Sequence, residues 1–398
     1  MPILRAIAAC VLLFAAMNPA TARDSSPSPP SPKAALERLF TQPVEAGWFA
    51  PVFLDQVSAG QVATIVAGLT DQYGALRDIT GAGDSFVVGL ARADIPARIA
   101  LDDEGRIRTL LFRPAIASGA TLKDYLAAIT ALPGRTSVLV TTGGETVAAH
   151  EPDAVLAVGS AIKLAILAAL NDAVADRRLA WDQVVALKPA WRSLPTSTLI
   201  DWPDGSPVTV ATLRNLMISA SDNMATDALI DLVGRTPIEA LAPRNTPFAT
   251  TAELFKLQAD RDQRSLWNKA DTPGRREILA HLDQQPLPAL ADLPEDPGSA
   301  EWFATARELC ALLERVAGSP AFTINPGPAE RADWQSVAFK GGSDSGVLNL
   351  STRVVGKDGT PHCVVATWNN PGGAAPLDRL MPIYRGMLAS LRSAATLE

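Results

Sequence analysis

The stretch Ser160-Ala-Ile-Lys163-Leu-Ala-Ile-Leu-Ala-Ala-Leu170 places two polar side chains at the start of an apolar run. The run continues to Val174 and predicts a buried helix with Lys163 in its first turn. Residues three apart share one face of a helix, so Ser160 and Lys163 should lie about 5–6 Å apart at Cβ. Burial disfavours a charged lysine, so Lys163 can act as the base that activates Ser160. The alternative is structural: an N-capping serine beside a lysine that reaches solvent.

Two further short motifs carry polar residues where a site could form. Ser221-Asp-Asn223 precedes a helical stretch, and Lys340-Gly-Gly342 followed by Ser343 ends a predicted strand over 336–340. Two glycines after a strand let a ligand approach the backbone closely. Each motif also has an ordinary explanation, a helix N-cap cluster for the first and a glycine turn for the second.

The three motifs occur in one order, and over residues 125–395 the chain resembles the serine β-lactamase and penicillin-binding-protein superfamily, nearest the class A β-lactamases. The resemblance implies an enzyme with an acyl-enzyme intermediate at Ser160. It would open β-lactams, a reaction that confers antibiotic resistance, or cleave related esters and amides. Lys163 would accept the proton of the nucleophile directly or keep the network polarised. Ser221 would relay a proton to the leaving nitrogen.

The same resemblance implies the residues that bind substrate. Asn223 would hold the substrate amide or Lys163, and Lys340 would attract the substrate carboxylate. The backbone N–H groups of Ser160 and Ser343 would form the oxyanion hole, with Gly342 on the same strand. The resemblance implies no metal ion and no cofactor.

Two departures from the class A pattern concern substrate binding and turnover. Gly341 stands where a threonine normally helps to hold the carboxylate, and Ser343 or Ser345 could supply that hydroxyl instead. Asp222 is expected to be structural.

The more serious departure concerns deacylation. Class A enzymes place a Glu four residues before an Asn to activate water. If Asn245 matches that Asn, the position four before it is Leu241. Glu239 and Glu253 lie nearby, but neither has the right spacing. We therefore expect slow turnover, or a substrate for which Lys163 or a histidine activates the water.

Two other functions remain open on the same sequence. The first is a penicillin-binding D-Ala-D-Ala carboxypeptidase, transpeptidase or esterase that deacylates slowly. The second is a non-catalytic binding protein whose first domain mediates association. The intact set of three motifs argues against the second.

The N-terminal residues have the pattern of an export signal. Arg5 precedes an apolar run over 6–17, and Ala20-Thr-Ala22 is a small-x-small ending, so 1–22 is predicted to be a cleaved signal peptide. About 12 apolar residues are too few to cross a bilayer, so no stable membrane span is expected after cleavage. A Ser/Pro tract over 23–33 reads as a linker. The protein is therefore predicted to be periplasmic or secreted.

Two domains are predicted after the linker, and both are α+β. Residues 34–118 show helical spacing, then strand-like runs over 85–90, 97–101 and 107–112. Residues 122–396 begin and end with strands, so we expect one antiparallel sheet built from both ends, backed by helices and an all-helical subdomain.

Nearly the whole chain resembles a family that fuses an isomerase-like cone domain (ketosteroid-isomerase or cystatin-like) to a β-lactamase-like domain. The family includes an esterase-like protein of the clavulanic-acid cluster. The resemblance is carried by stretches such as Trp48-Phe-Ala-Pro51 and Asp201-Trp-Pro-Asp-Gly205. The first domain would then be a lid, a substrate-edge module or the surface of a homodimer.

Composition excludes several classes of protein. The 398 residues carry 35 Lys and Arg against 42 Asp and Glu, a net charge of −7 that argues against nucleic-acid binding. The three histidines are scattered, which makes a multi-histidine metal site improbable and suits a hydrolase whose base is a lysine. Removal of the signal peptide leaves Cys310 and Cys363, which could pair or remain as buried thiols.

Overall fold

The computed structural model describes residues 30–113, 115–194, 197–294 and 300–392. The predicted signal peptide, and the linker up to residue 29, lie outside these ranges. Helix α1 begins at Pro32 with Ser31 as its N-cap, so ordered structure starts two residues before the predicted domain boundary at 34. No helix among the described residues is both long and apolar enough to span a bilayer.

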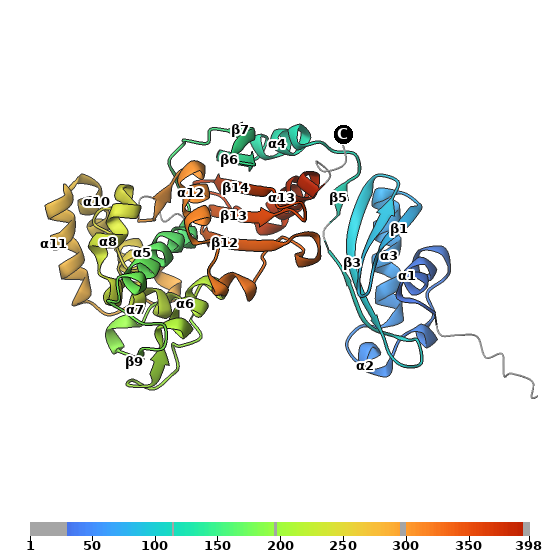
Figure 1. Cartoon of the computed structure of the whole chain (residues 1–398), viewed down its shortest axis with the longest axis horizontal. Helices are drawn as coiled ribbons and strands as arrows, with labels where there is room; N and C mark the ends of the chain where they lie inside the picture. The colour runs from blue at the N-terminus through green and yellow to red at the C-terminus, as the bar shows by residue number, and fades with distance from the viewer. Residues whose placement is uncertain (1–29, 114, 195–196, 295–299, 393–398) are drawn as a thin grey trace, which may run out of the picture.

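The N-terminal part packs three helices against an antiparallel sheet with the strand order β1-β2-β3-β4, and β5 also pairs with β3 (Figure 1). Its elements are α1 (Pro32–Thr41), α2 (Pro51–Leu54), α3 (Ala59–Tyr73), β1 (Leu76–Ala82), β2 (Ser85–Leu90), β3 (Ala93–Leu101), β4 (Ile107–Phe112) and β5 (Ile116–Ala117). Helix α3 starts with a capping box between Ser58 and Gln61. Leu36 of α1 and Val62 of α3 join Val88 and Ile95 in one apolar core.

Two of these strands were not predicted. In β1 only Ile79 is buried, so the strand lacks the alternating apolar pattern that identifies the others. Strand β5 has only two residues. The α+β composition of this part agrees with the sequence, whereas its likeness to isomerase-like cone domains stays a prediction.

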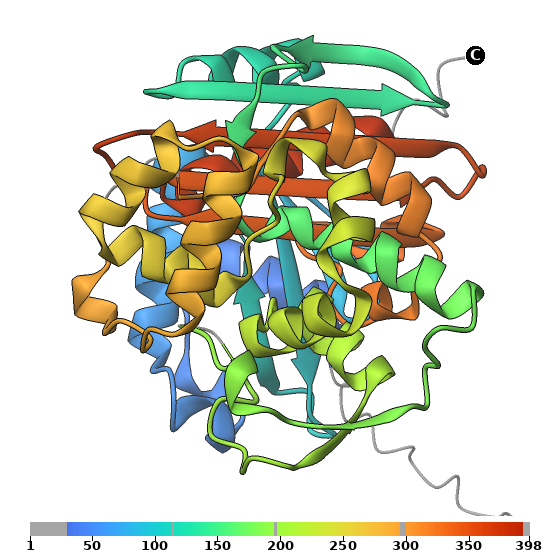
Figure 2. The same ribbon diagram turned by 90° about the vertical axis from the view of Figure 1, so that its left-hand side faces the viewer.

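The second part is built on an antiparallel sheet with the order β12-β13-β14-β6-β7. Its strands are β6 (Arg135–Thr142), β7 (Glu145–His150), β12 (Ser336–Asp344), β13 (Val347–Val355) and β14 (Pro361–Asn369). Strand β14 pairs with β6, which precedes it by about 220 residues, as in His362 beside Thr142. Figure 2 shows this hairpin of β6 and β7 lying along the C-terminal strands. The expected sheet made from both ends of the domain is confirmed.

Helices cover both faces of this sheet because side chains alternate along each strand. Val138 and Val364 pack against α4 (Leu122–Thr130) and α13 (Leu377–Arg392). Leu139 and Val365 belong to the core on the opposite face, with α5 (Lys163–Ala175) and α12 (Ala306–Val316). On that face, Cys310 of α12 and Cys363 of β14 form a disulfide, with their Cα atoms 6.0 Å apart.

A helical region lies beyond α5 and completes the domain (Figure 1). It contains α6 (Val210–Ser219), α7 (Asn223–Val233), α8 (Arg235–Leu241), α9 (Thr251–Ala259), α10 (Arg261–Lys269) and α11 (Thr272–Asp283). Two small two-stranded sheets also form in this part. One pairs β9 (Val184–Ala186) with β10 (Pro207–Thr209), and the other pairs β8 (Leu156–Ala157) with β11 (Phe303–Ala304). Short 3-10 helices lie at Ala46–Trp48, Gly159–Ile162, Pro189–Trp191, Pro243–Asn245, Leu290–Asp292, Pro320–Thr323 and Arg331–Asp333.

Candidate active site

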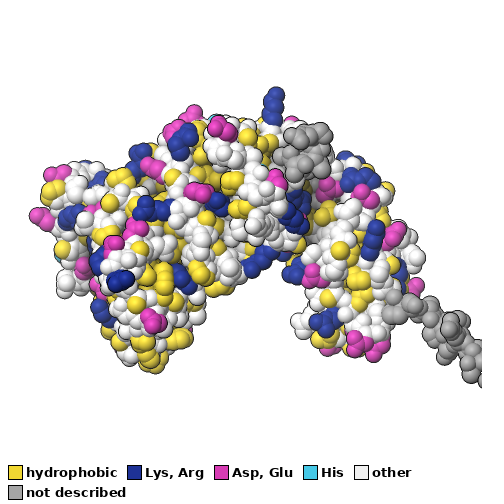
Figure 3. All heavy atoms as spheres, in the orientation of Figure 1, with side chains coloured by type: hydrophobic (Ala, Val, Ile, Leu, Met, Phe, Trp, Pro, Cys, Tyr) yellow, Lys and Arg dark blue, Asp and Glu magenta, His cyan; other side chains and the backbone are white. Residues whose placement is uncertain are grey.

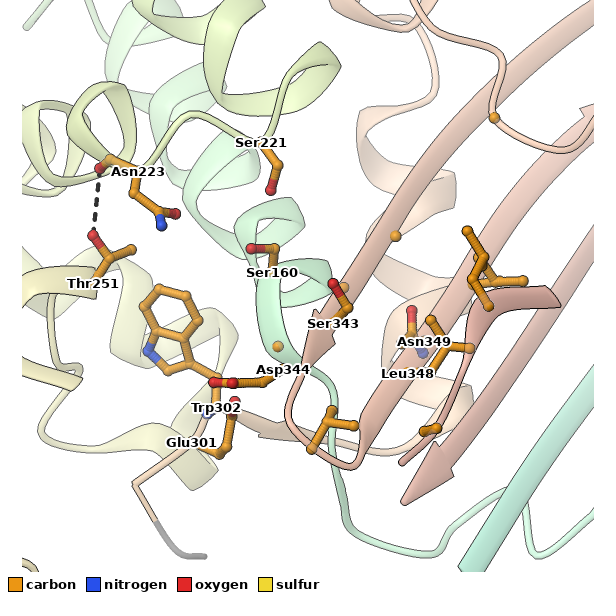
Figure 4. Close-up of a pocket in the computed structure, with 18 of the residues that line it drawn as sticks. Ser160, Ser221, Asn223, Thr251, Glu301, Trp302, Ser343, Asp344, Leu348 and Asn349 are labelled. Carbon is orange, nitrogen blue, oxygen red and sulfur yellow. Dashed lines mark hydrogen bonds between the residues drawn. The ribbon is translucent and has the colours of Figure 1, made fainter. Parts of the chain in front are cut away.

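The Ser-x-x-Lys segment lies between the helical region and the sheet. Ser160 sits in the 3-10 helix η2 (Gly159–Ile162), which continues directly into α5. Ser160 lines a cavity of about 760 Å³ together with Ser221, Asn223 and Ser343. Figure 4 shows the side chains of Ser160 and Ser221 directed into the same space. Three segments that are distant in the sequence thus contribute to one cavity.

Lys163 is completely buried beside this cavity. Its Nζ donates hydrogen bonds of 2.7 Å to the carbonyl oxygen of Ser221 and to Oδ1 of Asn223, and it lies 3.3 Å from Oγ of Ser221. Two positions of the nitrogen are therefore filled by backbone and amide oxygens. The third faces the hydroxyl of Ser221. A lysine that reaches solvent, the structural alternative, is excluded.

Lys340 approaches the same hydroxyl from the sheet. Its Nζ lies 3.1 Å from Oγ of Ser221 and also donates to the carbonyl of Gly341. Ser221 Oγ is therefore within hydrogen-bonding distance of two lysine nitrogens. Ser221 has a φ of +58°, which a residue other than glycine rarely adopts. The strained backbone holds this hydroxyl between the two lysines.

Burial lowers the pKa of both lysines, and the charge of Lys340 lowers that of Lys163 further. Burial, and then the nearby charge of Lys340, hold the pKa of Lys163 well below its ordinary value. Burial lowers the pKa of Lys340 to about 7. Asp222 and Asp227 act in the opposite direction on Lys163, but more weakly. The arrangement favours the neutral amine of Lys163.

The rest of the Ser-Asp-Asn motif is held by backbone contacts. Asp222 caps helix α7 by accepting a hydrogen bond from the N–H of Ala225, and it also binds Oγ of Ser197. The side-chain nitrogen of Asn223 donates to the carbonyl of Leu194. Asp222 thus has the contacts of a structural residue. Asn223 contacts Lys163, which is one of the two partners predicted for it.

The glycines after Lys340 are required by close packing. A Cβ atom on Gly342 would lie 2.0 Å from the carbonyl oxygen of Val158 and 2.7 Å from the backbone nitrogen of Ser160. A Cβ atom on Gly159 would lie 3.0 Å from the backbone nitrogen of Ser343. The backbones that carry the two predicted oxyanion-hole N–H groups are therefore in direct contact.

Packing also explains the departure from Lys-Thr-Gly. A Cβ atom on Gly341 would lie 3.0 Å from the ring of Phe339 and 3.3 Å from the carbonyl oxygen of Asn349. A threonine would need these neighbours to move. The missing hydroxyl is thus a consequence of the aromatic ring at position 339.

None of the groups considered from the sequence as substitutes for the class A glutamate lines the 760 Å³ cavity. Glu239 pairs with Arg276, and Glu253 is held by Arg235 through two hydrogen bonds. Asn245 binds the backbone N–H and C=O of Phe303, at strand β11. The cavity lining includes neither these residues nor Leu241, nor any of the three histidines.

Sequence reasoning missed several residues in the cavity wall. Thr251, at the start of α9, contacts the carbonyl of Asn223 (Figure 4). Glu301 and Asp344 line the same cavity, beside Trp302. Asp344 directly follows the predicted Ser343, whereas no periodicity or motif marks Glu301.

The described part of the chain contains no group of three or more His, Cys, Asp or Glu side chains that could hold a metal ion.

Comparison with known proteins identifies a family for this chain. A family model described as "Beta-lactamase enzyme family" matches residues 121–323, just over half of the chain. No curated protein matches the chain.

Several solved structures are similar at low sequence identity. A beta-lactamase from Sphaerobacter thermophilus is 20% identical, with 70% of this chain and 98% of that chain covered and a TM-score of 0.47. A beta lactamase from Xanthomonas campestris is 15% identical, with coverages of 69% and 99% and a TM-score of 0.48. The structure of PBP-A is 18% identical, with coverages of 68% and 94% and a TM-score of 0.43.

Proposed function

Because this chain belongs to the beta-lactamase enzyme family, we propose that residues 122–396 form a serine hydrolase that is acylated at Ser160. Its substrates are β-lactams or related esters and amides. The observation that carries the proposal is the environment of Lys163, a fully buried lysine whose nitrogen is held by Ser221 and Asn223 at the edge of the cavity that Ser160 lines.

In the acylation step, Oγ of Ser160 attacks the carbonyl carbon and its proton passes to the neutral amine of Lys163, directly or through Ser221. The backbone N–H groups of Ser160 and Ser343 stabilise the oxyanion. Ser221 then returns a proton to the leaving nitrogen. Support for a neutral Lys163 comes from its lowered pKa, and the third position of its nitrogen faces Oγ of Ser221, through which a proton can pass.

Lys340 is proposed to bind the substrate carboxylate. It lies in the middle of β12 and contacts Oγ of Ser221, which lines the cavity. Lys340 itself is almost completely buried, so its charge would act on the substrate through Ser221. Ser343 offers a further hydroxyl in the cavity wall.

Export to the periplasm or the medium is part of the proposal. The predicted signal peptide supports it, and so does the disulfide between Cys310 and Cys363, because disulfides persist mainly in oxidising compartments. We further propose that residues 34–118 act as a lid, a substrate-edge module or the surface of a homodimer.

The test is the intact mass of the purified protein after incubation with benzylpenicillin, a chromogenic cephalosporin or a simple ester. The wild type should gain the mass of the acyl group or release product, and Ser160→Ala should do neither. Ser219→Ala is the matched control, because the hydroxyl of Ser219 donates to the carbonyl of Asn215 and Ser219 does not line the cavity. Acylation or turnover that persists in Ser160→Ala would overturn the proposal.

A penicillin-binding carboxypeptidase or esterase is the second candidate. The absence of Glu239 and Glu253 from the cavity favours slow deacylation, the property that separates the two functions. A long-lived adduct and release of D-Ala from a D-Ala-D-Ala peptide would support the second candidate, and rapid loss of the adduct with product would support a lactamase. If the wild type forms no adduct and no product with any of these compounds, a non-catalytic binding protein is the remaining function.

A further inference from the structure

Two carboxyl groups meet inside the cavity of Ser160. Glu301 and Asp344 both line that cavity. Figure 4 shows their carboxyl groups directed toward one another beside Trp302. Glu301 is only 8% exposed. Two adjacent carboxyl groups repel each other when both are charged, so their position in the cavity requires an explanation.

The backbone ties both acids to the nucleophile. The carbonyl of Trp302, the residue after Glu301, accepts a 2.9 Å hydrogen bond from the N–H of Val158, two residues before Ser160. Asp344 follows Ser343, whose backbone packs against Gly159. The pairing of β8 with β11 therefore positions Glu301 relative to Ser160, and the end of β12 positions Asp344.

The other hydrogen-bond partners of Glu301 and Asp344 are uncharged. Asp344 accepts hydrogen bonds from the N–H of Ser345 at 2.7 Å and from Nε2 of Gln258 at 2.9 Å. Glu301 accepts from the N–H of Trp302 at 3.2 Å. Among the described residues, neither acid forms a salt bridge, whereas Glu253 and Glu239 each bind an arginine.

We propose that Glu301 and Asp344 together are the base that activates water for the deacylation of acyl-Ser160. This inference rests on the proposed function, because it assumes that Ser160 is acylated. It assigns the deacylation step to residues that are distant in the sequence from Leu241, the position expected from class A sequences.

The pair can hold one proton, as two adjacent carboxyl groups do when they share a site. Burial, and then the hydrogen bond to and negative charge of Asp344, raise the pKa of Glu301 well above its ordinary value. Asp344 accepts two further hydrogen bonds, from the N–H of Ser345 and from Nε2 of Gln258. The pair therefore carries one negative charge and one proton.

The proposed step balances as follows. The water oxygen attacks the ester carbon of acyl-Ser160 while one water proton passes to the free oxygen of Glu301, whose own proton moves to Asp344. The tetrahedral intermediate then breaks the bond between carbon and Oγ of Ser160. The pair returns the proton to Oγ, so that the acid product leaves and both Ser160 and the singly protonated pair are restored.

The experiment separates acylation from deacylation in Glu301→Gln and Asp344→Asn. Acylation is followed by the first-turnover rate with benzylpenicillin and the cephalosporin, and deacylation by the decay of the adduct mass after excess ligand is removed. We expect acylation within about threefold of the wild type and deacylation slower by about 100-fold or more in both variants. Glu239→Gln is the matched control, a buried acid outside the cavity, and its adduct should decay at the wild-type rate.

Hydroxylamine distinguishes a lost base from a displaced acyl group. It attacks esters without needing a general base, so it should release the acyl group from both variants as fast as from the wild type. Adduct lifetimes that match the wild type in both variants would overturn the inference. So would a wild-type adduct that never decays, or acyl groups that hydroxylamine cannot release. A wild type without any adduct or turnover would overturn the proposed function itself, which is a separate outcome.

Discussion

The two parts of the molecule differ in whether they bury charged side chains. In the N-terminal part, ion pairs such as Arg98 with Asp84 lie on the surface, with side chains about half exposed (49% and 53%). Up to residue 118, no buried side chain among the described residues is polar or charged. The second part buries Lys163, Lys340, Asp227 and Glu301. Figure 3 shows that both parts nevertheless present mixed Lys, Arg, Asp and Glu side chains on the visible face.

The difference indicates where chemistry can take place. A surface ion pair contributes little and changes no pKa enough to matter for catalysis. A buried charge destabilises the fold unless it is compensated, and buried groups with shifted pKa values cluster at functional sites. The expected effects of substitutions should follow the same division between the two parts.

The largest effect is expected from the buried lysine beside Ser160. Lys163→Met removes the proton acceptor and should lower the acylation rate by about 1,000-fold or more, measured as the first turnover with the chromogenic cephalosporin. Lys188→Met is the control, because Lys188 pairs with Asp231 at the surface. Equal losses in the two variants would remove the contrast between buried and exposed lysines.

The disulfide should have a large effect on stability that is confined to the second part. Cys310 and Cys363 are 53 residues apart, so removing the bond through Cys310→Ala with Cys363→Ala should lower the free energy of unfolding by about 4 kcal/mol. Urea unfolding, followed by tryptophan fluorescence, measures it. A loss below about 1 kcal/mol would show that packing of α12 on the sheet suffices without the bond.

A smaller effect is expected from pH. Lys340 binds an anion only in its charged form, which is lost as pH rises through its pKa of about 7. For a substrate with a carboxylate, kcat/KM should therefore fall about tenfold between pH 7 and 8.5, whereas an ester without a carboxylate should show no such fall. Lys163 must be neutral, and because its pKa is lowered its contribution is lost only toward acid pH. Lys340→Arg should abolish the alkaline fall, and an unchanged fall would exclude Lys340 as its cause.

The smallest effect is expected from the surface of the N-terminal part. Asp84→Asn removes the partner of Arg98 and should shift the melting temperature by less than about 2 °C, with no change in acylation. Differential scanning calorimetry checks it. A larger shift would mean that exposed pairs carry more of this domain's stability than their burial indicates.

The sequence predicted the parts of the site that are encoded locally. Ser160 and Lys163 lie one helical turn apart, and the Ser-Asp-Asn and Lys-Gly-Gly motifs are each contiguous, so their residues could be named before the fold was known. The sheet was predictable because its strands have alternating or continuous apolar runs. The site roles of these residues remain proposals until they are tested.

What sequence reasoning missed depends on contacts between distant segments. Glu301 and Asp344 come together only because β11 pairs with β8 and β12 packs on η2. The pairing of Cys310 with Cys363 could not be decided, because an apolar surrounding suits a thiol and a disulfide equally. Strand β1 was missed because solvent exposure leaves it with one buried side chain, Ile79.

The sheet of the second part has a consequence for the order in which the chain folds. Strand β6 pairs with β14, which lies about 220 residues later in the chain. The sheet of the second part therefore cannot form completely until almost all of that part has been synthesised. The N-terminal sheet pairs strands that follow each other closely, and contacts of short sequence separation form fastest. The N-terminal part should therefore fold first, before the second part is complete. Cys363 lies in β14, the last strand, so the disulfide with Cys310 can form only after that strand has been synthesised.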